Sequence, residues 1–465
     1  MRTKKLLPRR RRQGVVLVMA MIFMVVFSAF SVSLATFTGT NIQIAKNHRV
    51  ANRARYAAES GLEVMRYWLS QVSISGTTSD SQRFNAICTS LQSVLADANA
   101  TNLNATQSGS ILSIPSVSLA GGSSDQFTAA LQAVDVNSLR LSVTGYHDTV
   151  QRTIQVDYLF GSKANSVFDF GAATKGPLSI SGNIELNGVN IAIESNAYIE
   201  SLDETLALSI VGNSQIGGNV KIANPLGMVD LQGGQAGIGG ETGQNAIDNH
   251  VEFGVPLAEF PEPNPAQFES YAINVIDANT DTSADATFEN IRIPAGLNPH
   301  FSGSITLKGV TFIETPNVVT FSGTVDMTGI IVGNGSENDD SGTNQLIFQG
   351  DVDSLPISTL PAESQYEGLH EQVGTFIMTP GFAISFTGNF STLAGAIAGN
   401  GITFSGNAGG TINGSIINYS HQEMTLSGNS DLYFNRSGLD DIPAGFVPEI
   451  TLAFDASSYR ELTLQ

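Results

Sequence analysis

The side chains of this 465-residue chain that could do chemistry are mostly carboxylates. The densest group lies in the segment 334–344, where Glu337, Asp339 and Asp340 are interspersed with three asparagines. Such oxygen ligands suit Ca²⁺, but their spacing does not match an EF-hand loop, which needs oxygens at alternate positions and a distal glutamate. A calcium site and a solvated acidic loop are the two alternatives here, and we expect no other metal and no cofactor.

Carboxylates that could hydrolyse a polysaccharide would have to work in pairs. The remaining candidates are scattered along the chain: Asp203, Glu204, Asp326 and Asp351. Asp203 and Glu204 are adjacent, so on a strand their side chains would point to opposite faces. The sequence also lacks the HExxH, GxSxG and P-loop motifs. We therefore expect no catalytic residues and no enzymatic activity.

The charge of the chain is distributed very unevenly. Seven of its 22 Lys and Arg residues precede Gly14, whereas the first carboxylate is Glu59. The chain after its amino-terminal apolar segment therefore holds 15 Lys and Arg against 42 Asp and Glu, a net charge of −27. Because nucleic acid is polyanionic, this balance argues against nucleic acid as a partner. The only cysteine, Cys88, excludes an intramolecular disulfide and a Cys-rich zinc site, and we expect it in a core.

The first structural element that the sequence predicts is an apolar segment, Val15 to Phe37, which contains 23 residues and no charge. As a helix it would span about 35 Å, enough to cross a bilayer. The basic cluster before it predicts an amino terminus in the cytoplasm and an extracytoplasmic remainder. A cleavable secretory signal, which normally has a shorter apolar core, is the alternative.

The helical pattern continues beyond the membrane-length segment to about Gln71. Small and apolar residues recur there at steps of three and four: Ala51, Ala54, Ala58, Leu62, Met65, Trp68 and Leu69. The opposite face carries charged residues, among them Arg55 and Glu59, one turn apart. The spacing predicts one long helix with an apolar face in its second half.

These residues carry a family resemblance. RRQGVVLVMAMIFMVVFSAF followed by NRARYAAESGLEVMRYWL resembles the amino terminus of type IV pilin-like proteins, in particular PilX-type minor pilins and the pseudopilin that caps the type II secretion filament. The resemblance implies that a prepilin peptidase cuts after Gly14 and makes Val15 the mature amino terminus. It also matches Ala57, Ala58 and Glu59 to an Ala-Ala-Glu segment of the family.

Two positions depart from the pattern of major pilins. Those proteins begin with Phe and have Glu at the fifth mature position, whereas this chain has Val15 and Met19. The missing glutamate implies a minor, initiating or tip subunit. An ordinary signal anchor is the alternative.

A small α+β region is predicted after the long helix. DSQRFNAICTSLQSVLADA reads as a short helix, and LRLSVTGYHDTVQRTIQVDYLFG alternates polar and apolar residues on both sides of a turn, as a β-hairpin does. We expect His147 to be a solvated residue of that turn. The pilin resemblance implies a small antiparallel sheet against the exposed half of the long helix.

The rest of the chain repeats short phrases such as FSGSITLKG, FSGTVDMTG, FTGNFSTLAG, FSGNAGG and LSGNSDLYF. The intervals are 20 residues from Ser302 to Ser322, 18 from Thr387 to Ser405 and 22 from Ser405 to Ser427. With 47 Gly and only 14% charged residues, this pattern favours short strands separated by Gly and Asn corners. A fixed interval predicts a parallel β-helix, in which Asn183, Asn389, Asn407 and Asn429 could stack as a hydrogen-bonded ladder. A β-sandwich with Gly-rich turns is the competing fold.

The predicted fold is thus an α+β pilin-like amino-terminal part followed by an all-β parallel β-helix. The predicted regions are a basic leader (1–14), a transmembrane and amphipathic helix (15–72), a small α+β head (73–162), a parallel β-helix (163–435) with insertions near 224–300 and 334–380, and a terminal cap (436–465).

The predicted function is structural. We expect a non-enzymatic minor or tip subunit of a type IV pilus or type II secretion pseudopilus, held in the bacterial inner membrane and exposed on the filament or cell surface. Its expected partners are the prepilin peptidase, other pilin-like subunits, the membrane and a surface or polysaccharide ligand. The alternative is a membrane-anchored β-helix protein that binds or degrades polysaccharide.

Overall fold

The computed structural model describes residues 13–97, 105–119, 124–339, 341–437 and 442–462, so the basic leader up to residue 12 lies outside the described residues. The chain divides into two compact units. The helical unit comprises 1–74, 78–161 and 451–465, and the parallel-sheet unit comprises 75–77 and 162–450. The chain leaves the helical unit after Gly161 and returns at Thr451, so the parallel-sheet unit is an insertion in it.

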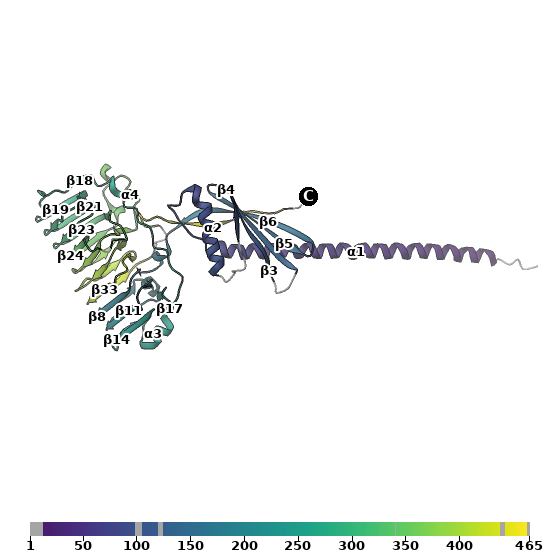
Figure 1. Ribbon diagram of the computed structural model, residues 1–465, viewed down its shortest axis with the longest axis horizontal. Helices are drawn as coiled ribbons and strands as arrows, with labels where there is room; N and C mark the ends of the chain where they lie inside the picture. The colour runs from purple at the N-terminus through teal and green to yellow at the C-terminus, as the bar shows by residue number, and fades with distance from the viewer. Residues whose placement is uncertain (1–12, 98–104, 120–123, 340, 438–441, 463–465) are drawn as a thin grey trace, which may run out of the picture. The chain divides into compact units, whose positions relative to one another are not determined.

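The helical unit contains a long helix and an antiparallel sheet (Figure 1). The helices are α1 (Gln13–Leu69) and α2 (Asp80–Asp97). The sheet has the order β1-β35-β6-β5-β4-β3-β2. Its strands are β1 (Ile74–Ser75), β2 (Thr106–Ser108), β3 (Ile111–Ser118), β4 (Asp125–Asp135), β5 (Ser138–His147), β6 (Val150–Lys163) and β35 (Glu449–Leu462).

The second half of α1 packs on this sheet through its predicted apolar face. Ala54, Ala58, Met65 and Leu69 are fully buried, as the spacing of small and apolar residues predicts. The closest approach is at Gly145 of β5, where an added Cβ would lie 2.2 Å from the backbone nitrogen of Ala58 and 2.3 Å from the carbonyl oxygen of Ala54. Only a residue without a side chain allows the helix and the strand to meet this closely.

The carboxyl-terminal segment corrects a prediction. The sequence predicted that 436–465 would cap the end of the repeated strands, but β35 joins the antiparallel sheet beside β6. β35 also contacts α1, since the Arg66 guanidinium lies 4.9 Å from the centroid of the Phe454 ring. An edge strand satisfies its backbone hydrogen bonds by pairing with a neighbour, whatever its distance in sequence.

Over the described residues, the parallel-sheet unit consists of a 12-stranded, a 9-stranded and a 7-stranded sheet, in which almost all strand pairs are parallel. The chain passes through the three sheets in turn: β7 lies in the first, β8 in the second, β9 in the third, and β10 returns to the first. Parallel pairing differs from the antiparallel pairing of a typical β-sandwich.

The strands and helices of this unit have the following bounds. The first sheet contains β7 (Ala172–Thr174), β10 (Ala197–Ile199), β13 (Val220–Ile222), β17 (Val251–Phe253), β18 (Asn274–Val275), β19 (Ala286–Ile293), β21 (Ile305–Ile313), β23 (Val325–Gly333), β25 (Val352–Leu355), β26 (Thr375–Thr379), β29 (Ala396–Gly399) and β32 (Ile416–Asn418). The second contains β8 (Leu178–Gly182), β11 (Leu206–Gly212), β14 (Met228–Gln232), β20 (His300–Phe301), β22 (Val318–Phe321), β24 (Gln345–Phe348), β27 (Ala383–Phe386), β30 (Ile402–Phe404) and β33 (Met424–Gly428). The third contains β9 (Glu185–Gly188), β12 (Gln215–Ile216), β15 (Gly237–Ile238), β16 (Glu241–Thr242), β28 (Thr392–Leu393), β31 (Gly410–Ile412) and β34 (Leu432–Phe434). The helices are η1 (Ser166–Asp169), η2 (Ala192–Ser195), α3 (Gly243–His250), α4 (Ala266–Glu269), η3 (Ile357–Thr359) and η4 (Ser364–Tyr366).

The order of strands in the first sheet does not follow the sequence. β7 pairs with β32 as well as with β10, and the edges of the sheet are β17 and β18. The segment 254–273 therefore connects opposite edges, and its Phe260 ring lies about 6 Å from the rings of Tyr198 and Tyr419. It helps to bury the outer face of this sheet. The predicted insertion near 224–300 is too wide, because strands of all three sheets occupy 228–253 and strands of the first two resume at 274.

The core of the unit contains a column of parallel phenylalanine rings. Ring centroids in successive strands of the second sheet are 4.9, 5.3, 4.8 and 5.0 Å apart, with interplanar angles of 12° or less: Phe301, Phe321, Phe348, Phe386 and Phe404. Neighbouring strands in most sheets are twisted by about 20–25°, and flat sheets are typically stabilised by stacking. The column indicates a flat sheet in this region.

Glycine, and not any of the four predicted asparagines, adopts the left-handed backbone at the repeated corners. Gly182, Gly406 and Gly428 have φ of 111°, 72° and 108°. A Cβ at Gly182 would lie 2.2 Å from the carbonyl oxygen of Gly428. A Cβ at Gly428 would likewise lie 2.2 Å from the carbonyl oxygen of Gly406. None of the four predicted ladder asparagines makes a side-chain hydrogen bond to another residue that the structure describes. Asn183 and Asn429 donate from their backbone N–H groups instead.

Candidate functional site

The first candidate site is the surface of α1. Its apolar residues from Val15 to Ile44 are exposed; Val15, for example, is 64% exposed and Met19 59%. The helix is long and apolar enough to cross a membrane. The predicted cleavage site lies at its start, since Gly14 and Val15 follow Gln13, the first residue of α1. An unpaired apolar helix surface of this size needs a lipid or protein environment.

The predicted helix motif lies where α1 meets the sheet. Ala57 and Ala58 are 3% and 0% exposed and face Gly145. Glu59 is partly exposed, and one of its oxygens accepts a hydrogen bond from Arg55 Nε at 3.0 Å. Burial next to a glycine explains the two small residues of the motif. The ion pair is exposed and contributes little to stability.

The structure places His147 differently from the prediction. It is 6% exposed, and its Nδ1 lies 3.2 Å from Ser124 Oγ and in contact with Asp125 Oδ1. The three residue types are those of a serine hydrolase, but a nucleophilic serine must use the ring nitrogen opposite the one that the carboxylate orients. Here both partners share one nitrogen, so the arrangement does not match a catalytic triad.

The predicted carboxylates come together only in part. Asp203 and Glu204 lie in the connection between β10 and β11, far along the chain from Asp351. Asp351 and Asp353 line a cavity of about 270 Å³, and Asp353 is the cross-strand partner of Asp326. Both lining carboxylates are exposed to solvent. A general acid at neutral pH needs an environment that keeps it protonated, which solvent exposure does not provide.

Some oxygen atoms of the acidic loop, residues 334–344, accept hydrogen bonds from other residues of the same loop. Asp339 accepts hydrogen bonds from the Ser341 backbone at 3.1 Å and from the Asn344 amide at 3.0 Å. Asp340 lies outside the described residues. Over the part of the chain that the structure describes, three or more His, Cys, Asp or Glu side chains nowhere form a group that could hold a metal.

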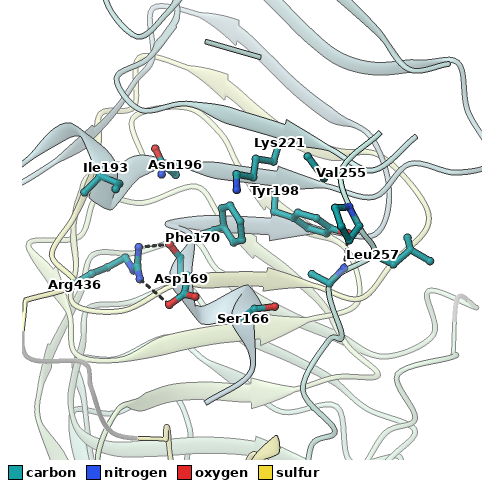
Figure 2. Close-up of a pocket in the computed structure, with 12 residues that line it drawn as sticks. Ser166, Asp169, Phe170, Ile193, Asn196, Tyr198, Lys221, Val255, Leu257 and Arg436 are labelled. Atoms are coloured by element: carbon teal, nitrogen blue, oxygen red, sulfur yellow. Dashed lines mark hydrogen bonds and ion pairs between the residues drawn. The ribbon is translucent and has the colours of Figure 1, made fainter. Parts of the chain in front are cut away.

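A larger cavity, which the sequence did not indicate, lies in the parallel-sheet unit (Figure 2). Its volume is about 570 Å³. It is lined by residues from η1, η2, β10, β13, the segment 255–258 and the end of β34: Ser166, Asp169, Phe170, Ile193, Asn196, Tyr198, Lys221, Val255, Pro256, Leu257, Ala258 and Arg436. Small-molecule sites are commonly of this size, with apolar walls and a few polar groups.

The outer face of the second sheet is a further candidate surface. One row across neighbouring strands reads Thr320, Ile347, Ser385, Thr403, Thr425, Ser179 and Ser209. All are partly exposed. Within the described part of the chain, only Thr425 of this row makes a side-chain hydrogen bond. The remaining hydroxyl groups of this flat face can therefore hydrogen-bond to an external polar surface.

Comparison with known proteins gives one family match. Residues 13–63 match the family model described as PilX N-terminal. No curated protein matches the sequence. Among solved structures, the chain is similar to the competence-associated pilin ComZ from Thermus thermophilus, with 12% identity over 89% of this chain and 97% of that one and a TM-score of 0.22. It is also similar to an ice-binding protein from the Antarctic ascomycete Antarctomyces psychrotrophicus. The identity is 14% over 58% of this chain and 97% of that one, and the TM-score is 0.15.

Proposed function

We propose that this chain, whose amino-terminal part is PilX-type and pilin-like, is a minor or tip subunit of a type IV pilus or a type II secretion pseudopilus. A prepilin peptidase removes the leader after Gly14. The helix then anchors the subunit in the inner membrane, with the amino terminus in the cytoplasm and the remainder outside, until the subunit enters a filament. There it displays the parallel-sheet unit for assembly or adhesion.

The observation that carries this proposal is the division of α1 into two halves. Residues 15–44 expose apolar side chains, whereas Ala54, Ala58 and Leu69 are buried against the sheet of the same unit. The exposed half can pass from lipid to the apolar core of a filament without losing contacts within its own unit. Small residues in neighbouring helices favour close packing in such an environment.

The displayed unit is proposed to be a parallel β-helix. Three observations support this: the parallel pairing of strands, the passage of the chain through three sheets in turn, and the aligned phenylalanine column. The unit is inserted in the helical unit between β6 and β35. An insertion lets a pilin-like part keep its fold while it carries a separate surface module, since the ends of an inserted domain are usually close together.

Mass spectrometry of the mature amino terminus tests the proposal. In cells that contain a prepilin peptidase, the chain should begin at Val15, and Gly14→Val should leave the leader attached and keep the subunit out of sheared filaments. Gly39→Ala is the matched control, because no heavy atom lies within 4 Å of the position of its Cβ. An intact leader in the unmodified protein, or a start after Ala35, contradicts the proposal.

A second candidate function is that of a membrane-anchored protein that binds or degrades polysaccharide. The cavity between Asp351 and Asp353 favours it, because it is the place where the structure brings candidate carboxylates together. Reducing-end release from soluble polysaccharides would distinguish the two functions. Activity that Asp351→Asn and Asp353→Asn abolish would establish the enzyme, whereas release no greater than that of the double variant would exclude it.

A further inference from the structure

The cavity in Figure 2 collects positive charge in a unit that has very little of it. Residues 162–450 contain only six Lys and Arg, and two of them, Lys221 and Arg436, line this cavity. The other four have partners elsewhere in the unit: Lys163 with Glu449, Lys175 with the rings of Phe260 and Tyr419, Arg292 with Glu269 and Glu314, and Lys308 with Glu289. The charged side chains that line the cavity, Lys221, Arg436 and Asp169, thus sum to +1 in an otherwise acidic unit, which favours an anion there.

Arg436 is incompletely neutralised. Its side chain is 16% exposed, and its carboxylate partner, Asp169, lies 3.9 Å away with a side chain that is 81% exposed. Its Nε is buried without a partner among the described residues. Burial lowers the pKa of Arg436, and this effect outweighs the opposing effects of Asp169 and Glu194. A further negative charge in the cavity would stabilise the guanidinium.

Lys221 can supply the second contact. Its nearest acidic group, a Glu252 oxygen, is 3.9 Å from Nζ, and both side chains are about half exposed or more, at 48% and 66%. Such a pair is weak and can exchange for another anion. In Figure 2 the ammonium group of Lys221 points toward Phe170, while Arg436 approaches the cavity with Asp169 from another side.

The remaining walls suit a ring with an apolar face and polar edges. Phe170 is partly exposed, and its ring centroid is 5.4 Å from that of the buried Tyr198. Ile193 and Leu257 are 57% and 63% exposed at the same cavity. Asn196 Oδ1 accepts a hydrogen bond from the Asn219 backbone at 2.8 Å, which leaves the NH₂ group of its amide as a donor.

We propose that this cavity binds a carboxylate-bearing sugar residue of a surface glycan. Lys221 and Arg436 face the carboxylate, Asn196 donates to the carboxylate or a ring hydroxyl, and Phe170 packs against the apolar face of the sugar ring. The inference deepens the adhesive role proposed above and rests on it, since display on a filament or cell surface gives the cavity access to glycans.

Titration calorimetry on the purified full-length chain in detergent micelles tests the proposal without any filament. The probes are glucuronate, N-acetylneuraminate, glucose and benzoate. At least one acidic sugar should bind, with glucose and benzoate about tenfold weaker or more, because charge-assisted hydrogen bonds and the sugar edge both contribute. Salt should weaken the binding.

Variants locate the site. Lys221→Gln and Phe170→Leu should each reduce the affinity for the acidic sugar about tenfold or more. Lys308→Gln and Phe288→Leu are the matched controls, because both residues lie in the same unit but outside the cavity. Equal affinities in test and control variants would overturn the site, benzoate binding as tight as that of the acidic sugars would overturn the sugar class, and no binding at all would overturn both. Cleavage after Gly14 and filament entry can still be observed in each of these cases, so failure here is distinct from failure of the proposed function.

Discussion

Each of the two units of this protein is stabilised by a different kind of internal contact. In the helical unit, neighbouring antiparallel strands are also neighbours in sequence from β2 to β6, and one helix covers the sheet through small residues. In the parallel-sheet unit, most strands pair with one that lies about a full repeat away, as Ile305 pairs with Val325, and aligned rings stack along the second sheet. The helical unit therefore depends on a few close backbone contacts, and the parallel-sheet unit on a repeated stack.

Because of this difference, we expect a destabilising substitution in one unit to leave the stability of the other unit unchanged. The chain offers a probe for this, because its only tryptophan, Trp68, lies in α1 and is 8% exposed. Trp68 fluorescence reports on the helical unit, whereas far-ultraviolet circular dichroism reports on both. Unfolding in urea followed by the two signals can compare the units in one sample.

The largest effect is expected from Phe348→Ala. Phe348 is fully buried, and its ring stacks between Phe321 and Phe386 at 5.3 and 4.8 Å. Removing it leaves a cavity in the column and should lower the free energy of unfolding of the parallel-sheet unit by about 3–5 kcal/mol. The dichroism transition should move to lower urea while the Trp68 transition stays. Ile347→Thr, an adjacent outward-facing change, is the control; equal shifts of both signals in Phe348→Ala would show that the units are coupled.

Gly145→Val should destabilise the helical unit and leave the parallel-sheet unit unchanged. Its side chain would collide with backbone atoms of Ala54 and Ala58, which cannot move without bending α1. We expect a loss of about 3 kcal/mol in the helical unit, at the upper end of overpacking effects. The Trp68 transition should shift and the dichroism of the parallel-sheet unit should not. Gly39→Ala, in an open part of the same helix, should change neither transition; a Gly145→Val protein of unchanged stability would contradict the close packing.

The sequence predicted the helical unit well where its contacts are local. The three- and four-residue spacing from Ala54 to Leu69 identified the packed face of α1, and the alternation around His147 identified the β5–β6 hairpin. The burial of His147 was missed because its partners, Ser124 and Asp125, come from another strand. The position of β35 was missed for the same reason, since it pairs with β6 across about 300 residues.

For the parallel-sheet unit, the sequence predicted short parallel strands, and the strands do pair in parallel, but the order of the strands was not predicted. Its repeats identified short strands and glycine corners, but the pairing of β7 with β32 depends on contacts across more than 240 residues. The candidate cavity was missed because its lining comes from 166–258 and from Arg436. No single segment carries a motif for it. Asp351 immediately precedes β25 and Asp353 lies within it; of these two cavity carboxylates, only Asp351 was a candidate from the sequence.

Cys88 offers a smaller test of the separation between the units. It is 1% exposed, and burial raises the pKa of its thiol to about 11. At pH 8 the thiolate fraction should be about a hundredfold lower than in an exposed cysteine, so alkylation by iodoacetamide should follow opening of the helical unit. Because the pKa is raised on folding, the thiol stabilises the fold below its ordinary pKa, and this contribution is lost as the pH rises toward the folded value.

The labelling rate should then depend on which unit is damaged. Gly145→Val should accelerate alkylation of Cys88, and Phe348→Ala should leave it unchanged. Rapid labelling of the unmodified protein would show that α2 opens independently of the sheet. Faster labelling in Phe348→Ala would contradict the separation of the two units.

The smallest effect should come from the ion pair between Arg140 of β5 and Asp157 of β6. Arg140 donates from Nε at 2.7 Å and from Nη2 at 3.0 Å, and this hydrogen bonding lowers the pKa of Asp157. Because both side chains remain partly exposed, at 30% and 22%, Arg140→Gln should cost only about 0.5–1 kcal/mol at pH 7. A carboxylate with a lowered pKa stabilises the fold above its ordinary pKa and loses this effect as the pH falls, so the difference between the proteins should shrink toward pH 3.

The ion pair between Arg140 and Asp157 also tests how small a change in unfolding free energy the two signals can assign to one unit. Arg140→Gln should move only the Trp68 transition, Asp157→Asn should have a similar effect, and the double variant should be less destabilised than the sum of the two. Lys308→Gln removes a comparably exposed pair from the parallel-sheet unit and should leave the Trp68 transition in place. If the loss in Arg140→Gln were as large at pH 3 as at pH 7, the stabilisation would come from packing of the arginine stem and not from its charge.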